Sequence, residues 1–85
     1  MSREVRWLPR ARRDLKKLDP PVRSRVVDAV SEFARTGQGS VERLVDFTPP
    51  EYRLRVGDWR VRFVRDEEQR LQGLRVLPRD KAFRR

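Results

Sequence analysis

The 85-residue chain has 22 basic and 13 acidic side chains, for a formal net charge of +9, and 19 of the basic residues are arginine. It contains no cysteine and no histidine, which excludes disulfides and thiolate zinc sites and removes the commonest general base. The length fits one domain over residues 1–85, and the charge favours a nucleic acid or an acidic protein as partner.

Hydropathy and composition also bear on location and chemistry. No segment approaches the ~18 consecutive apolar residues of a membrane span, and the N-terminus has no apolar signal-peptide core. We therefore expect a cytoplasmic protein with no membrane partner. Without histidine or cysteine, any catalysis has to depend on arginine, lysine, tyrosine or carboxylates. We expect neither a metal ion nor another cofactor.

The first half of the chain predicts a short strand followed by a helical hairpin. Residues 4–8 alternate between polar and apolar side chains, as a strand does. From Pro9, apolar residues recur at helical spacing to Leu18. A second helix is expected to start after Asp19 and to end near Gly37, because proline follows the first and glycine favours a helix end.

The second half predicts mainly strands. Residues 38–50 are expected to form a mostly irregular connection, followed by a hairpin over residues 52–63. A last strand runs from about residue 70 to 77, with Leu74 and Val76 on one face and a bulge at Gly73. This order, β-α-α-β-β-β, is an α+β layout: an antiparallel sheet with a helical hairpin on one face and an open basic face on the other.

The predicted hairpin alternates apolar residues with arginines on both sides of a Gly-Asp turn. If the two residues that flank the turn are paired, Arg55 lies opposite Arg60 and Arg53 lies opposite Arg62. Like charges opposite each other across two strands are destabilising, so stability alone does not explain these four residues. Clustered guanidinium groups suit a polyanion, because each can donate two hydrogen bonds to phosphate oxygens. A solvated basic surface is the simpler alternative.

Four segments carry a family resemblance: Val5–Trp7, Ala11–Leu18, Tyr52–Arg60 and Val76–Arg84. The hairpin, followed later by a basic residue and by an aromatic residue four positions further on, is the most specific feature. On these segments the chain resembles the RelE/ParE family of bacterial type II toxin–antitoxin systems, and it is closer to the RelE branch. The resemblance implies a RelE-like toxin whose concave basic face binds RNA and whose helical side binds an antitoxin segment.

The resemblance also implies an activity. Toxins of the RelE branch are endoribonucleases that cut mRNA in the ribosomal A site without a metal: the 2′-hydroxyl attacks the adjacent phosphate while basic residues hold it. Matched by position, the catalytic residues are Arg53, Arg55, Arg60 and Arg79. Further RNA contacts are expected from Arg62, Lys81 and Phe83. The implied partners are mRNA, ribosomal RNA and a cognate antitoxin, with which the toxin would form a hetero-oligomer.

Phe83 departs from the family pattern, because many RelE-like members have a tyrosine there that is proposed to accept the 2′-hydroxyl proton or to stack on a base. Phenylalanine keeps the stacking but lacks the acceptor, and arginine stays protonated. Glu51 is expected to pair with an arginine rather than to act as the base. Two alternatives stay open: a non-enzymatic inhibitor that binds DNA gyrase, as in the ParE branch, and a degenerate member that only binds nucleic acid.

Overall fold

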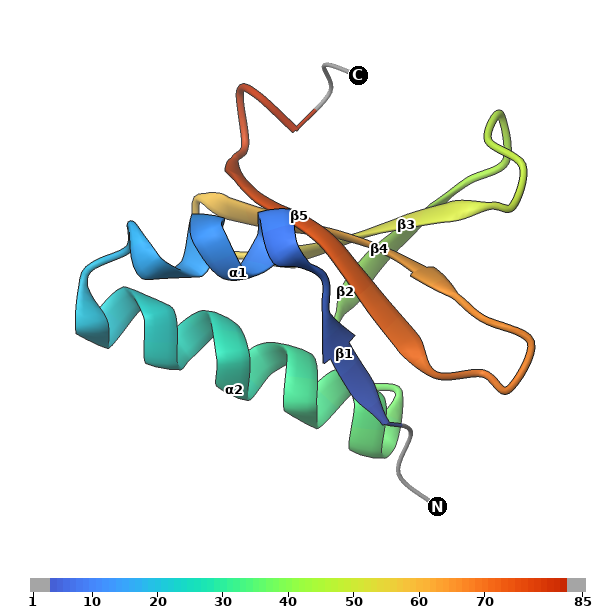
Figure 1. Ribbon diagram of the computed structural model, residues 1–85, viewed down its shortest axis with the longest axis horizontal. Helices are drawn as coiled ribbons and strands as arrows, with labels where there is room; N and C mark the ends of the chain where they lie inside the picture. Colours follow the sequence, from blue (N-terminus) through green and yellow to red (C-terminus); the bar gives the residue numbers. More distant parts are fainter. Residues whose placement is uncertain (1–3, 83–85) are drawn as a thin grey trace.

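The computed structural model describes residues 4–82, which form two helices and a five-stranded sheet (Figure 1). The elements in chain order are β1 (Val5–Trp7), α1 (Pro9–Lys16), α2 (Pro20–Thr36), β2 (Ser40–Leu44), β3 (Glu51–Val56), β4 (Trp59–Arg65) and β5 (Leu71–Pro78). The strand order in the sheet is β1-β5-β4-β3-β2. β1 and β5 are parallel, whereas the other neighbouring strands are antiparallel.

The predicted α+β architecture is confirmed, with two differences in the sheet. The prediction of an irregular connection is wrong at Ser40–Leu44, which forms edge strand β2 against β3. The side chains of β2 are mostly exposed, so its sequence lacks the apolar alternation that reveals a half-buried strand. The prediction of a purely antiparallel sheet is also wrong, because β1 pairs in parallel with residues 71–73.

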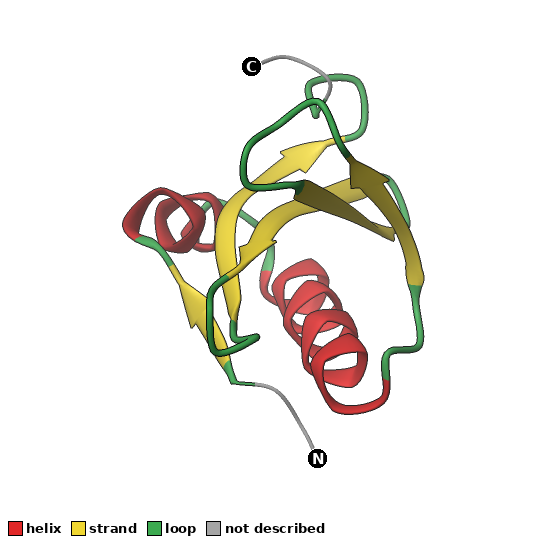
Figure 2. Cartoon of the chain, turned by 90° about the vertical axis from the view of Figure 1, so that its right-hand side faces the viewer, coloured by secondary structure: helices red, strands yellow, loops and turns green. Residues whose placement is uncertain are grey.

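The core lies between α2 and the concave side of the sheet, which curves around this helix (Figure 2). Val26, Val30 and Phe33 recur at helical spacing and are buried against the strands. The ring of Phe33 lies 5.6 Å from that of Phe63 on β4. Burying side chains of this size stabilises the fold by roughly 1.5–3 kcal/mol each. Gly37 ends α2 with a φ of 77°, as predicted. Neither helix in residues 4–82 has the length and apolar character needed to cross a membrane.

The predicted bulge in β5 is confirmed. The ladder between β4 and β5 shifts its register after Arg62, which leaves Leu74 without a partner. Gly73 is needed here, because a Cβ atom would lie 2.7 Å from Cε3 of Trp7. The prediction that Leu74 and Val76 share a face is wrong: Val76 is 2% exposed in the core, whereas Leu74 is half-buried and outside it.

Helix α1 packs beside β5 (Figure 1), and Asp14 joins the two elements. The Asp14 carboxylate accepts hydrogen bonds from Nε and Nη2 of Arg75, at 2.8 and 3.2 Å, and from the backbone N–H of Val76 at 2.9 Å. Burial acts to raise the pKa of Asp14, but the hydrogen bonds from Arg75 and Val76 lower it overall. Asp14 thus joins α1 to the part of β5 that β1 does not cover.

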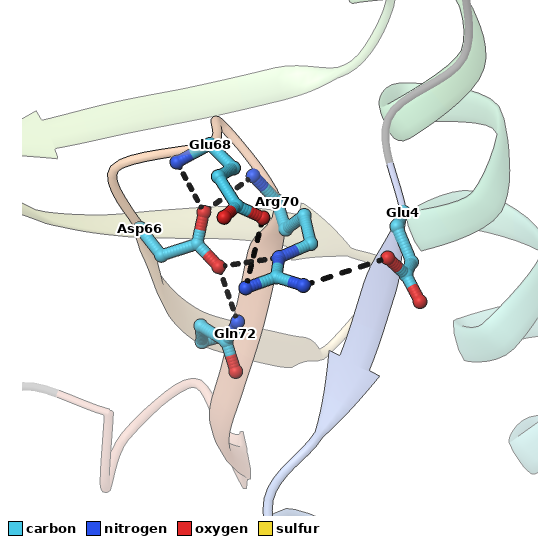
Figure 3. Close-up of polar contacts among 5 residues, drawn as sticks. All are labelled: Glu4, Asp66, Glu68, Arg70 and Gln72. Carbon is cyan, nitrogen blue, oxygen red and sulfur yellow. Dashed lines mark hydrogen bonds and ion pairs between the residues drawn. The ribbon is translucent and has the colours of Figure 1, made fainter.

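The turn between β4 and β5 is ordered by Asp66 (Figure 3). Its carboxylate accepts hydrogen bonds at 2.8 or 2.9 Å from the backbone N–H groups of Glu68 and Arg70 and from the side chains of Arg70 and Gln72. Arg70 also lies 3.9 Å from Glu4, which directly precedes β1. Burial acts to raise the pKa of Asp66, but these hydrogen bonds prevail and lower it to about 2.

The variant Asp66→Asn is expected to have a lower melting temperature (Tm) than the wild type at neutral pH. Because the folded-state pKa of about 2 lies below the ordinary value of 3.8, the carboxylate stabilises the fold fully above about pH 4 and loses this effect toward about pH 2. Thermal unfolding should therefore show a Tm difference that shrinks across this range. The exposed Asp46→Asn serves as control. A Tm difference that does not change with pH would contradict the assignment.

Candidate nucleic-acid interface

Five arginines from three adjacent strands lie on the face of the sheet opposite α2. Arg55 pairs with Arg60 and Arg53 pairs with Arg62 across β3 and β4, so both pairings predicted from the sequence are confirmed. Arg62 in turn pairs with Arg75 on β5. Side chains directly opposite each other on neighbouring strands share a face. We call this set, Arg53, Arg55, Arg60, Arg62 and Arg75, the arginine face.

Arg79 joins the arginine face through the turn that follows β5. Its backbone N–H donates a hydrogen bond of 2.9 Å to the carbonyl of Asp58, two residues before Arg60. Burial lowers the pKa of Arg60, and repulsion by the charges of Arg55 and Arg79 lowers it further, whereas the nearby charge of Asp58 acts weakly in the opposite direction. Three of the four residues predicted to be catalytic are therefore close enough to interact. The fourth, Arg53, lies two positions before Arg55 on the same face.

The arginine face is less open than the sequence predicted. Arg53 is 8% exposed and Arg60 is 9% exposed, while Arg62 is half-buried and Arg55 is exposed. Nη1 of Arg60 donates hydrogen bonds of 2.9 and 2.8 Å to two backbone carbonyls in and beside the hairpin turn. The Arg60 guanidinium is thus fixed in place, and a fixed charge needs little reorganisation to stabilise an anion.

Two carboxylates neutralise the end of the face nearest β5. Glu51 is 4% exposed and accepts a hydrogen bond from Nε of Arg62, which confirms the prediction that Glu51 pairs with an arginine. Arg75 is paired with Asp14. Within residues 4–82, no ion pair is formed by Arg55, Arg60 or Arg79. The positive charge of these three arginines is therefore offset only weakly, by Asp58 near Arg60.

A groove of about 670 Å³ adjoins the arginine face between α1, β5 and the C-terminal turn. Its apolar lining consists of Leu8, Pro9, Leu74 and Leu77. Its basic lining consists of Arg10, Arg62, Arg75 and Lys81. Two of the predicted RNA-binding residues, Arg62 and Lys81, thus lie in one groove. The third, Phe83, lies outside the described residues.

Arg10 and Arg75 also line the groove, although the sequence pattern did not predict them as site residues. For Arg75 a signal existed, because the bulge at Gly73 lets this arginine face Arg62 across β5 and β4. Arg10 has the appearance of a solvated helix residue, and only the packing of α1 beside β5 places it at the groove. Among residues 4–82, no three carboxylates gather in a way that could hold a metal ion.

Comparisons with known proteins give one family and several similar structures. The family model described as ParE toxin of the type II toxin–antitoxin system parDE matches residues 5–83. The chain is 30% identical to a chain of the RelBE2 toxin–antitoxin complex from Mycobacterium tuberculosis, with a TM-score of 0.73 over 93% of this chain and 100% of that chain. No curated protein matched the sequence.

Two archaeal complexes show the same fold at lower identity. A chain of the RelE–RelB complex from Pyrococcus horikoshii OT3 is 21% identical, with a TM-score of 0.77 over 96% of this chain and 100% of that chain. A chain of the RelB–RelE complex from Methanococcus jannaschii is 18% identical, with a TM-score of 0.74 over 92% and 94% of the two chains. These structures confirm the RelE-like fold predicted from the sequence.

Proposed function

Because the chain belongs to the ParE toxin family, within the RelE/ParE superfamily, and is the toxin of a type II toxin–antitoxin system, we propose that it is a ribosome-dependent mRNA endoribonuclease of the RelE kind that works without a metal. The observation that supports this activity most is the approach of Arg55 and Arg79 to Arg60. The charges of both repel that of Arg60 more strongly than Asp58 attracts it, and a bound phosphate group relieves that repulsion.

In the proposed reaction the 2′-oxygen of a ribose forms a bond to the adjacent phosphorus, and the bond from phosphorus to the 5′-oxygen breaks. Negative charge gathers on the phosphate oxygens as this happens, and fixed cations aimed at it can supply several kcal/mol. In this proposal Arg55 and Arg60, the latter held by the turn carbonyls, bind the phosphate oxygens. Arg79 stabilises the departing 5′-oxygen. Arg53 extends the same basic strand.

The carboxylate of β3 has a different role in this proposal. Glu51 is buried and hydrogen-bonded to Arg62, so it is not available as a base in this arrangement. Its pairing balances charge inside the sheet face and keeps Arg62 in place. In this proposal the 2′-hydroxyl proton is therefore transferred to a group that is not part of the arginine face.

A cognate antitoxin is the proposed protein partner. The similar structures are toxin–antitoxin complexes, and a chain with a net charge of +9 suits an acidic partner. We infer a hetero-oligomer in which the antitoxin neutralises the toxin.

The family match favours a second candidate, non-enzymatic inhibition of DNA gyrase. The matching family model describes a ParE toxin. This candidate needs no proton acceptor, which agrees with phenylalanine at position 83.

One experiment separates the two candidates. The protein is expected to arrest growth when expressed alone, and primer extension on an mRNA in ribosome complexes should show cleavage within the A-site codon. A supercoiling assay with DNA gyrase, run in parallel, should show no inhibition. Growth arrest with inhibited gyrase and intact mRNA would instead establish the second candidate.

Binding of single-stranded RNA to the free protein should be mainly electrostatic. Four or five phosphate contacts predict a slope of roughly −3 to −4 in a plot of log affinity against log salt concentration, at about 0.7 per contact. Titrations from low to physiological salt measure this slope. A slope near zero would remove the proposed phosphate-binding role of the arginine face.

A further inference from the structure

The groove beside the arginine face differs in chemistry from the phosphate-binding cluster, the name used here for Arg55, Arg60 and Arg79. Four basic residues line the groove, but Arg62 is paired with Glu51 and Arg75 with Asp14. The other two basic residues of the groove, Arg10 and Lys81, form no ion pair within residues 4–82. The rest of the lining is leucine and proline. Such a surface suits a group with flat apolar faces and a polar edge better than it suits a second phosphate.

The two paired arginines in the groove are held in fixed orientations. Nε and Nη2 of Arg75 both donate to Asp14, at 2.8 and 3.2 Å, and Nε of Arg62 donates to the buried Glu51. A planar guanidinium can stack on a nucleobase while its edge is hydrogen-bonded elsewhere. Because these side chains are already ordered, little conformational entropy is lost when a base binds against them.

Two residues that line the groove lie close in sequence to Arg60 and Arg79. Arg62 follows Arg60 by two residues on the same face of β4, which corresponds to about 7 Å along a strand. Lys81 likewise follows Arg79 by two residues and lines the groove. A nucleotide whose phosphate lies at Arg60 therefore has its base within reach of the groove. The volume of about 670 Å³ falls in the roughly 300–1,000 Å³ range of small-ligand pockets.

We propose that this groove is a subsite for one RNA nucleobase next to the phosphate held by Arg55, Arg60 and Arg79. The base stacks against the fixed guanidinium planes and the leucine side chains, and Arg10 and Lys81 contact its polar edge or its own phosphate. This subsite rests on the proposed RNA-cleaving function and adds to it a contact with the base, beyond the contacts with the backbone.

The test uses a trinucleotide RNA that is 2′-O-methylated at every ribose and so cannot be cleaved, together with versions that lack one base. Fluorescence anisotropy measures their affinity for the full-length protein. The wild type is expected to lose about tenfold in affinity when the base at one particular position is removed. Leu74→Trp, which fills the groove, is expected to bind the complete RNA about tenfold more weakly and to be insensitive to that base.

Two further variants keep this test decisive. Val45→Trp adds the same ring at a position that is 71% exposed and outside the groove, and it should behave as the wild type. Leu77→Gln makes the lining of the groove more polar at similar size, and it answers the same question if thermal unfolding shows that Leu74→Trp does not fold. Unchanged base dependence in the groove variants would overturn the subsite.

The remaining outcomes separate the subsite from the proposed function. Salt-dependent RNA binding without any dependence on the bases would overturn the subsite alone. Absence of RNA binding, with mRNA also uncleaved on the ribosome, would overturn both. A synthetic peptide of alternating glutamate and leucine provides the last comparison: if Leu74→Trp abolishes binding of this peptide and leaves RNA binding unchanged, the groove binds a protein segment and the nucleobase assignment is wrong.

Discussion

Replacement of Arg55 by alanine is expected to lower mRNA cleavage on the ribosome by about 100- to 1,000-fold, the usual effect of removing one group that stabilises developing negative charge. The thermal stability of the protein should not decrease. Arg55 is exposed and lies directly opposite Arg60, so its removal relieves a repulsion worth a few tenths of a kcal/mol, roughly the scale of cross-strand pairs. Primer extension measures the activity and thermal unfolding measures the stability.

The matched control is Arg43→Ala. This variant loses the same charge from β2, but Arg43 lies opposite Tyr52 and so is not on the arginine face. It should cleave mRNA as the wild type does. Equal losses of activity in both variants would mean that net charge, and not the position of Arg55, carries the effect.

Arg60→Ala should lose activity to a similar extent but behave differently in thermal unfolding. Repulsion alone predicts a slight stabilisation, as for Arg55. The structure predicts the opposite sign, because Arg60 is 9% exposed and its guanidinium holds two backbone carbonyls of the hairpin turn. Without these bonds the part-buried carbonyls of Gly57 and Trp59 lose a donor, and a typical hydrogen bond contributes about 0.5–1.5 kcal/mol.

Glu51→Ala is expected to cause the largest loss of stability among these variants. The side chains of Glu51 and Arg62 are only 6% and 14% exposed, and removing one partner of a buried pair costs about 3–5 kcal/mol because it leaves the other charge uncompensated. At about 4–8 °C per kcal/mol for a domain of this size, Tm should fall by more than about 12 °C. Thermal unfolding monitored by circular dichroism measures it.

An exposed pair provides the comparison for Glu51. Glu32 and Arg35 are 46% and 63% exposed and lie 2.5 Å apart on α2, and such surface pairs contribute about 0–1 kcal/mol. Glu32→Ala should therefore change Tm by only a few degrees. If Glu51→Ala were as stable as Glu32→Ala but inactive, Glu51 would be a functional carboxylate and the structural role assigned to it would be wrong.

The register of the β3–β4 hairpin was determined by the sequence itself. Strict alternation of apolar residues and arginines leaves one register that buries Leu54 and Val61 together, and a shift by one residue would turn every arginine into the core. Gly57 accommodates the positive φ of 57° that the two-residue turn requires. The apolar side of α2 and the end of this helix were also predictable from the sequence. The spacing of apolar residues, the prolines at its start and the glycine at its end act within a few residues of one another.

Only the tertiary structure decided which charges are exposed and which are paired. Asp14 and Arg75 are 61 residues apart in the chain and meet because α1 packs beside β5. The burial of Arg53 and Arg60, the choice of Arg62 among the arginines as the partner of Glu51, and the groove itself likewise arise where separate elements converge. Local patterning fixes the face to which a side chain points, whereas desolvation and ion pairing depend on which distant segments cover that face, and no short-range signal encodes that arrangement.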